Sequence, residues 1–476
     1  MSASNSPLSE PVMAELAPIQ PPDDSRPVEA LLVGEPAAPD AESRKAVTAE
    51  LVDKRTWPTR CLVWIGSAFE WLFGLASLLA GLATLASLPV LQWISLGYLM
   101  ESSGRIARSG KLGDGFIGVR KAGRLGSLVL GTWLMLLPLR ALSGMWHAAY
   151  LIDPGGQGQR WGQIGLAIAT TMMTLHILCA WYCGGRLRHF FWPFLAPFSL
   201  AIWLLRRVFG VVAAALQTQP IQRSFLQRLL ADITRAQPLD QWFLPAMIWS
   251  GIRRRRGYQA CCDAVWETVV SLRLPYYFSL GLRGFLGALV WLAIPVGFYI
   301  GATTLPPGPA VLSGLLGALL LSITMTYLPF LEVRFAMENR LRAMFEPGRV
   351  HGDFRHAPWA FWLALTITLA FALPLYLLEI EATPEEAAFL CCLVFVAFVF
   401  PARLLTGWAV GCSIRRAAQG KPAHFVFRWT ARLGFVPVTG FYVLLLFFTR
   451  YTSWNGVWSL FGQPAVLTPT PFWGWN

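Results

Sequence analysis

Charged side chains are scarce in this chain of 476 residues: they make up 14% of it, against roughly 25% in a typical soluble domain. Hydrophobic residues make up 55%, and the aromatic content includes 22 Trp and 31 Phe. A soluble protein cannot remove so much apolar surface from water, because its surface grows almost as fast as its mass. The composition excludes an ordinary soluble fold and predicts a protein that uses a lipid bilayer as its apolar solvent.

The motifs of common enzymes and metal proteins are also missing. The eight Cys show no paired C-x-x-C spacing, and the sequence has no Gly-x-Ser-x-Gly elbow, His-Glu-x-x-His pair or phosphate-binding loop. His176, Cys179 and Cys183 share one face of a predicted helix, but the outer two would lie about 10 Å apart. Core packing is therefore the preferred interpretation, and we predict no catalytic residue, no metal site and no cofactor.

The few charges are unevenly distributed. Residues 1–60 carry ten acids and six bases, whereas the rest of the chain carries 33 bases and 16 acids. Residues 1–58 lack the basic start and early apolar core of a signal peptide, and their Pro and acid content predicts a disordered tail. A multi-span domain is predicted at 59–450 and an aromatic-rich tail at 451–476. Because the bases are scattered between apolar stretches, the predicted partners are the bilayer and its anionic headgroups, not nucleic acid.

Long apolar stretches predict the membrane spans, since a helix needs about 20 such residues to cross a bilayer. Seven spans are predicted, at 125–151, 161–185, 284–303, 311–331, 359–380, 387–411 and 433–449. The stretch 61–100 crosses either once, as a helix kinked at Pro89, or twice, as a tight hairpin. Whether 190–205 crosses stays open. The predicted fold is an all-α, polytopic transmembrane helical bundle of eight or nine spans with interfacial amphipathic helices.

The basic residues alternate regularly between the two sides of these spans. The predicted inner segments are all basic: 102–124, 186–275, 332–358 and 413–432. The predicted outer segments together contain a single base, Arg160: 152–160, 304–310 and 381–386. Basic loops stay in the cytoplasm, so we expect the C-terminus outside and leave the N-terminus open. The cell membrane, taken as a bacterial inner membrane, is the expected location.

Two inner segments have internal patterns of their own. Residues 206–275 form a basic cytoplasmic segment with ten Arg, including the run Arg253, Arg254, Arg255 and Arg256. Apolar residues precede that run, which is typical of a helix lying on an anionic membrane surface. In the segment 332–358, Arg334, Glu338 and Arg342 follow one another at intervals of four. This spacing predicts an exposed face of one helix.

Charged residues inside or beside spans are the candidate ligand or ion-pair residues, because charge is expensive there. Arg140 lies deep in its span; it either snorkels to the outer interface or faces the interior and pairs with an acid. Arg403 is either a basic anchor near the inner surface or a second ion-pair candidate. Glu70 precedes a long apolar run, where a carboxylate suits the start of a helix. Glu379 belongs to an acidic group between two spans.

Three short stretches carry a resemblance. They are Gly97-Tyr98-Leu99 with Arg105 and Arg108, Leu272-Arg273-Leu274-Pro275-Tyr276-Tyr277, and Phe400-Pro401-Ala402-Arg403-Leu404-Leu405. In these stretches the chain resembles a group of uncharacterised bacterial multi-pass membrane proteins. The first stretch is also similar to the beginning of the sequences of a broader family of unknown function. The resemblance implies a multi-span topology over residues 60–460 and no particular activity.

Two classes of function remain for such a chain. The first is transport or handling of an anionic lipid or small solute, with Arg140 lining a cavity among proline-broken helices. The second is a membrane scaffold or assembly factor that recruits partners through its acidic tail and its basic segment 206–275. A polar cavity would favour the first class, and a closed apolar bundle would favour the second.

Overall fold

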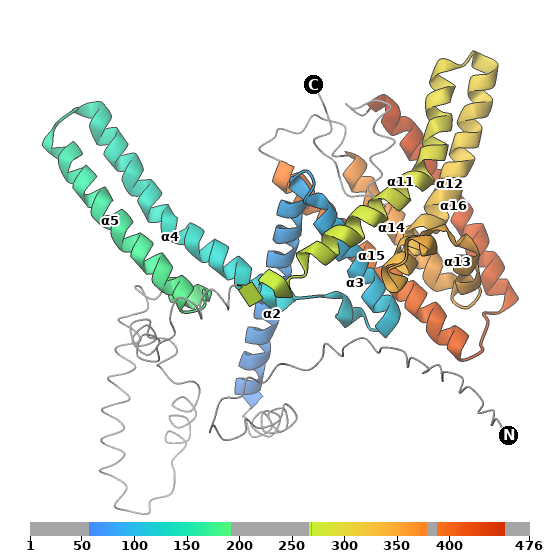
Figure 1. Ribbon diagram of the computed structural model, residues 1–476, viewed down its shortest axis with the longest axis horizontal. Helices are drawn as coiled ribbons and strands as arrows, with labels where there is room; N and C mark the ends of the chain where they lie inside the picture. The colour runs from blue at the N-terminus through green and yellow to red at the C-terminus, as the bar shows by residue number, and fades with distance from the viewer. Residues whose placement is uncertain (1–56, 192–265, 268, 378–387, 453–476) are drawn as a thin grey trace, which may run out of the picture. The chain divides into compact units, whose positions relative to one another are not determined.

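A computed structural model describes residues 57–191, 266, 267, 269–377 and 388–452, and every regular element in these ranges is a helix (Figure 1). The α-helices are α2 (Trp57–Ser87), α3 (Gln92–Ser109), α4 (Val119–Ile152), α5 (Gln157–Tyr182), α6 (Leu187–Phe190), α11 (Leu274–Thr304), α12 (Pro307–Glu338), α13 (Pro347–Phe354), α14 (Pro358–Leu377), α15 (Ala388–Ala418) and α16 (Phe425–Thr452). Two short 3-10 helices are η1 (Leu112–Gly115) and η3 (Leu341–Phe345).

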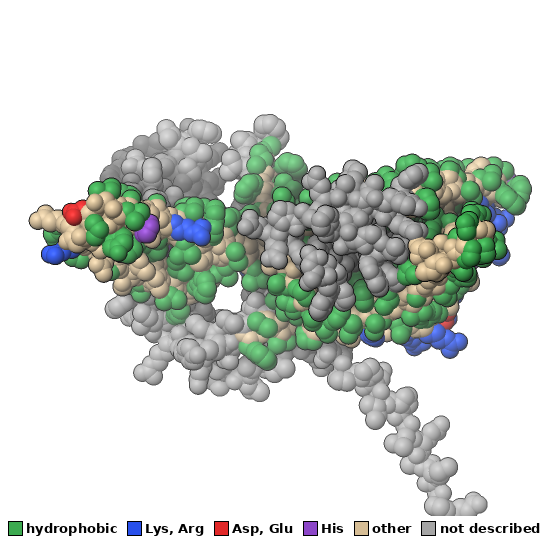
Figure 2. All heavy atoms as spheres, turned by 90° about the horizontal axis from the view of Figure 1, so that it is seen from above, with side chains coloured by type: hydrophobic (Ala, Val, Ile, Leu, Met, Phe, Trp, Pro, Cys, Tyr) green, Lys and Arg blue, Asp and Glu red, His purple; other side chains and the backbone are tan. Residues whose placement is uncertain are grey.

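Eight of these helices are long and apolar enough to cross a membrane. Seven of the eight coincide with the predicted spans, and the eighth is Trp64–Ser87 of α2. Apolar side chains cover most of the described surface, as expected of helices in lipid (Figure 2). The predicted all-α polytopic bundle is confirmed. The predicted tails lie outside the described residues except for 57, 58, 451 and 452, which are helical. The segment 206–265 and most of 190–205 also lie outside them.

The stretch 61–100 is divided into two helices at Pro89, so a single kinked helix is excluded. Val90 in the intervening turn has a φ of +71°, an uncommon backbone conformation for a β-branched residue. Leu82 of α2 and Ile94 of α3 belong to one apolar cluster, as expected if α3 is the second arm of a hairpin. Helix α3 is not among the helices that are apolar enough to span by composition.

Helix α3 is nevertheless the most enclosed helix of the described chain. Fourteen of its eighteen residues are buried, and it packs against α11, α12 and α15. Small residues bring the backbones together, as in other membrane helix pairs. A Cβ on Gly97 would overlap a carbonyl of α11, and one on Gly407 would overlap the backbone of Ser103. A Cβ on Gly104 would also be too close to Ala336 of α12, at 2.9 Å from its carbonyl carbon. This helix therefore forms the centre of a packed unit that includes α3, α11, α12 and α15.

Helices α3 and α15 run parallel, because contacting residues rise in step along both. Gly407 meets Ser103, Gly411 meets Ala107, and the Arg415 guanidinium donates to the carbonyl of Gly110. The segments that follow the two helices consequently lie at the same end of the packed unit. We call this the basic end, comprising residues 110–118, 339–357 and 419–424.

Helices extend well into the predicted inner loops. Residues 102–109 belong to α3, 332–338 to α12, and 413–418 to α15. The loops at the basic end are shorter than predicted because polar residues near these helix ends are held by other helices rather than by water.

Helices α4 and α5 form a long hairpin (Figure 1). The indole of Trp181 donates to the hydroxyl of Thr132 at 3.0 Å and joins the two arms. In the most apolar 18-residue stretch of each helix, only 11% of α4 and 6% of α5 is buried inside the structure. Their side chains are thus available to lipid or to other membrane proteins.

Candidate functional site

The most deeply buried charges of the described chain form one ion pair between two spans. Glu332 on α12 is fully buried, Arg403 on α15 is 2% exposed, and the Arg403 guanidinium donates to Oε2 of Glu332. The other carboxylate oxygen, Oε1, is buried without a hydrogen-bond partner among the described residues. A charge at this depth needs a partner, and the structure supplies one from a helix 71 positions away in the sequence.

Each partner follows a proline inside its helix. Pro329 precedes Glu332 by three residues, and Pro401 precedes Arg403 by two. A proline removes one backbone hydrogen bond and favours a bend in the helix. Both halves of the pair therefore sit where their helices are least rigid. The Thr406 hydroxyl donates to the Arg403 carbonyl at 2.9 Å and satisfies a further backbone group near the pair.

A second buried carboxylate lies on α3. Glu101 accepts from Nη2 of Arg108 at 2.6 Å and from the hydroxyl of Tyr276 at 2.9 Å. Arg105 approaches the same carboxylate at 3.9 Å. Nη1 of Arg108 also donates to the carbonyl of Ala336 at 3.0 Å. Glu101 and Arg108 thus connect α3 to the start of α11 and the end of α12.

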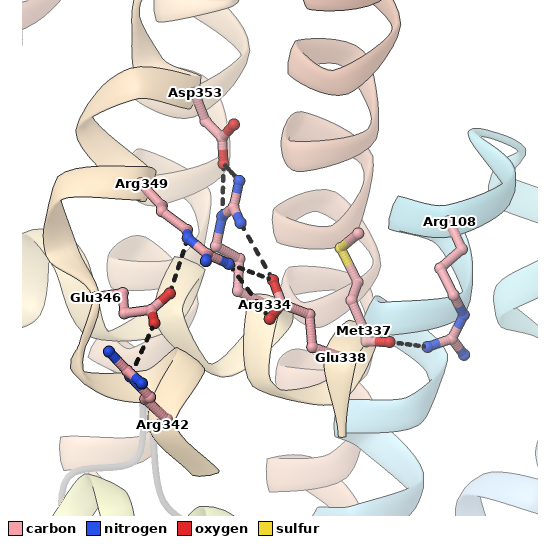
Figure 3. Close-up of polar contacts among 8 residues, drawn as sticks. All are labelled: Arg108, Arg334, Met337, Glu338, Arg342, Glu346, Arg349 and Asp353. Carbon is pink, nitrogen blue, oxygen red and sulfur yellow. Dashed lines mark hydrogen bonds and ion pairs between the residues drawn. The ribbon is translucent and has the colours of Figure 1, made fainter. Parts of the chain in front are cut away.

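A chain of alternating charges lies at the basic end, where three arginines and three acids form one network (Figure 3). Arg334 contacts Asp353 at 2.7 Å and Glu338 at 3.4 Å. Arg349 contacts Glu338 at 3.1 Å and Glu346 at 2.8 Å. Burial raises the pKa of Asp353, and the adjacent Arg334 opposes that rise. Because each base in this network has an acid, the network closes the end of α12 without leaving charge unpaired.

The predicted helix face of Arg334, Glu338 and Arg342 is wrong. Helix α12 ends at Glu338, and Asn339 caps it with a φ of +52°. Arg342 therefore lies in η3 and pairs with Glu346 at 3.5 Å, not with Glu338. Arg334 is also mostly buried, with 15% of its side chain exposed. The left-handed backbone conformation of Asn339 ends the helix between Glu338 and Arg342 and changes the chain direction there.

No protein-family model matches the chain, and neither the curated proteins nor the solved structures include a significant match. The function must therefore be argued from the site itself.

The structure separates the four candidate residues. Arg403 is buried in the ion pair described above, so its interpretation as a basic surface anchor is wrong. Arg140 is exposed on α4, and none of the ion pairs among the described residues includes it. Glu70 is exposed and lies thirteen positions after Trp57, the first residue of α2, so it is not at a helix start. Glu379, like the run Arg253 to Arg256, lies outside the described residues.

The remaining candidates, His176, Cys179 and Cys183, lie in or directly after the last two turns of α5 and are partly buried. Nε2 of His176 lies 2.8 Å from the carbonyl of Phe190. Cys183 follows the last residue of α5 rather than continuing its face. No group of three potential metal ligands occurs among the described residues.

Glu332, Glu101 and Asp353 are the residues that sequence reasoning missed. Glu332 follows the apolar run Leu328-Pro329-Phe330-Leu331 directly and was assigned to an inner loop. The signal that could have been used is an acid directly after an uninterrupted apolar run, in a chain that also has an Arg deep in another span. That signal could have paired Glu332 with Arg403.

Proposed function

We propose that this integral membrane protein binds an anionic group of a lipid or small solute within the membrane, at Arg403, and that Glu332 is its built-in counter-ion. The supporting observation is the complete burial of this pair between two spans. Apolar residues of similar volume often stabilise such a position as well as an ion pair does. A charged pair at this depth is therefore better explained by a function in ion binding.

The chemistry follows from the guanidinium. Arginine forms planar, two-point contacts with carboxylates and with phosphates. Glu332 competes with an incoming anion for these donors. When Glu332 takes up a proton or turns away, Arg403 loses this carboxylate and its donors can bind another anion. Binding of an anion together with a proton then leaves the net charge of the site unchanged.

The proline positions support a site that can open. Pro329 and Pro401 lie within one turn of the pair, so bending at either residue would separate α12 from α15 at this level. This is handling or transport rather than catalysis. The proposal includes a location in a bacterial inner membrane, which the resemblance to bacterial multi-pass proteins supports.

The test uses three variants of the full-length protein: Glu332→Gln, Arg403→Gln and the double variant. Each is purified in mild detergent with added phosphatidylglycerol, and bound lipid is counted by native mass spectrometry. We expect Glu332→Gln to retain more anionic lipid than the wild type, because the carboxylate that competes for Arg403 has been removed. The double variant should lose that gain.

The double variant also guards against misfolding, since it has no uncompensated buried charge. Equal lipid retention by Glu332→Gln and by the double variant would overturn the proposal for lipid. The same series is run with sulfate as a small anionic probe, measured by thermal shift. Failure with both probes would overturn the proposal as a whole.

One observation favours the alternative, a scaffold or assembly factor. The α4–α5 hairpin leaves apolar side chains exposed, among them Trp133 at 51% and Trp161 at 71%. Membrane scaffolds use such faces to bind other spans. A second protein that remains in stoichiometric amount after purification, and is lost on substituting both Trp by Ala, would favour this role.

A further inference from the structure

A second group of cations lies beside the basic end and contains no acid. We call it the basic cluster: His351 of α13, Arg355 directly after α13, and Arg428 and Arg432 near the start of α16. None of the ion pairs among the described residues includes any of the four. The neighbouring network of three arginines and three acids is balanced, so the imbalance is local to the cluster. The sequence agrees, since residues 413–432 contain five bases and no acid.

The cluster is held together tightly for a group of like charges. Nη2 of Arg432 lies 3.3 Å from Nε2 of His351. The Arg432 guanidinium also lies over the rings of Phe354 and Trp429, at 5.8 and 5.9 Å from their centroids. Arg428 precedes Arg432 by one helical turn and faces the same side. Its Nε is buried without a hydrogen-bond partner among the described residues.

The electrostatics of His351 show that cations crowd this position. Burial lowers the pKa of His351, and the charges of Arg432 and Arg355 lower it further. The neutral imidazole can accept a hydrogen bond from Arg432, which is why the two side chains can approach. Arg355 and Arg432, the two arginines that act on His351, have no counter-ion among the described residues.

The cluster lies near the start of a candidate membrane span, where lipid headgroups are expected. The candidate span of α16 begins at Phe425, so Arg428 and Arg432 occupy its first two turns. Phe425 and Trp429 on the same turns are 58% and 51% exposed. Exposed aromatic rings at the end of a span are typical of the membrane interface. An anion that reaches the cluster is therefore most readily supplied by the bilayer itself.

We propose that the basic cluster binds the phosphate of an anionic phospholipid from the leaflet at the basic end. The arginine guanidinium groups supply the paired donors that phosphate oxygens accept. The Arg428 Nε gains the partner that it lacks. This surface site is separate from Arg403, and it depends on a different observation from the proposed function.

The experiment measures phosphatidylglycerol binding to the full-length protein in detergent by native mass spectrometry, with phosphatidylcholine as the uncharged comparison. The variant is Arg428→Gln/Arg432→Gln. The matched control is Arg342→Gln/Arg349→Gln, which removes two bases from the same end but from the balanced network. Thermal unfolding of each protein verifies that it is folded.

We expect the affinity for phosphatidylglycerol to fall about tenfold or more in the cluster variant. The control should change by much less, and neither should alter the weak binding of phosphatidylcholine. Unchanged affinity in the cluster variant, or an equal loss in the control, would overturn the proposal. Inorganic phosphate is the second probe. If phosphate binds to the cluster but the wild type does not prefer phosphatidylglycerol to phosphatidylcholine, the cluster is a site for a soluble anion. That result would overturn the proposal that it binds lipid.

Discussion

The Glu332–Arg403 pair gives a quantitative prediction about stability. Replacing Glu332 by Leu leaves the buried Arg403 cation without its carboxylate, and replacing Arg403 by Met leaves the carboxylate alone. Removing one partner of a fully buried pair costs about 3–5 kcal/mol, because the remaining charge is uncompensated. Replacing both partners by apolar residues of similar size is often neutral or stabilising by about 1–4 kcal/mol. The double variant should therefore be at least as stable as either single one, despite carrying two substitutions.

The assay is reversible unfolding in mixed micelles by titration with a denaturing detergent, followed by circular dichroism. The four proteins form a double-mutant cycle, which isolates the energy that couples the two residues. The matched control is the same cycle on Arg342 and Glu346, a pair 3.5 Å apart in which Arg342 is 90% exposed. Such a surface pair should couple by only about 0–1 kcal/mol. If the buried cycle couples as weakly as the surface cycle, the two charges do not depend on each other and the reasoning is refuted.

Three further predictions use the same unfolding assay. Gly407→Leu should destabilise the protein by roughly 1–3 kcal/mol or more, because a Cβ there would overlap the backbone of α3. The control Gly440→Ala has open space around it and should be neutral or slightly stabilising. Similar losses of stability in both variants would contradict the packing of α3 against α15. The pKa of His351 is lowered from 6.5, so the unfolded chain binds this proton more readily; we expect stability to fall as the pH falls from 6.5 through the lowered value, and His351→Gln to remove that part of the pH dependence. Arg334→Ala should cost about 1.5–3 kcal/mol, since it removes charged hydrogen bonds from a mostly buried side chain, while Arg342→Ala should change stability by less than about 0.5 kcal/mol; the opposite order would show that the network of Figure 3 does not hold the helix end.

Hydropathy was sufficient for the long apolar helices. In α14, for example, an uninterrupted apolar run defines the span before any tertiary contact is considered. Only the first half of α3, within the stretch 61–100, could be recognised in this way. Its polar residues, such as Glu101 and Ser103, are acceptable in the membrane only because α11, α12 and α15 surround them. A hydropathy average treats such a helix as a loop, since it cannot include the neighbours that satisfy the polar groups.

The candidate site was predicted in half. Arg403 stood out as a cation deep in a span, but its partner was hidden by the assumption that a span ends where the first charge appears. Helix α12 continues for six residues beyond Glu332, to Glu338. Arg140 shows the converse: depth along a helix does not determine the direction in which the side chain points. Direction depends on which neighbours pack on each face, and a single sequence does not contain that information.

The central place of α3 has a consequence for how the protein is made. The ribosome completes Ser109 long before Leu274, the first residue of α11, and Ala388, the first residue of α15. At roughly 5–20 residues per second, the interval before even α11 emerges is on the order of 10 s or more. Throughout that interval the nascent helix carries Glu101 without Tyr276 and lacks the backbones that later enclose it. Its insertion must wait at the membrane surface or beside the translocation machinery until the second half of the chain arrives, so a truncated chain ending before α11 should be a substrate for membrane proteases rather than a stable fragment.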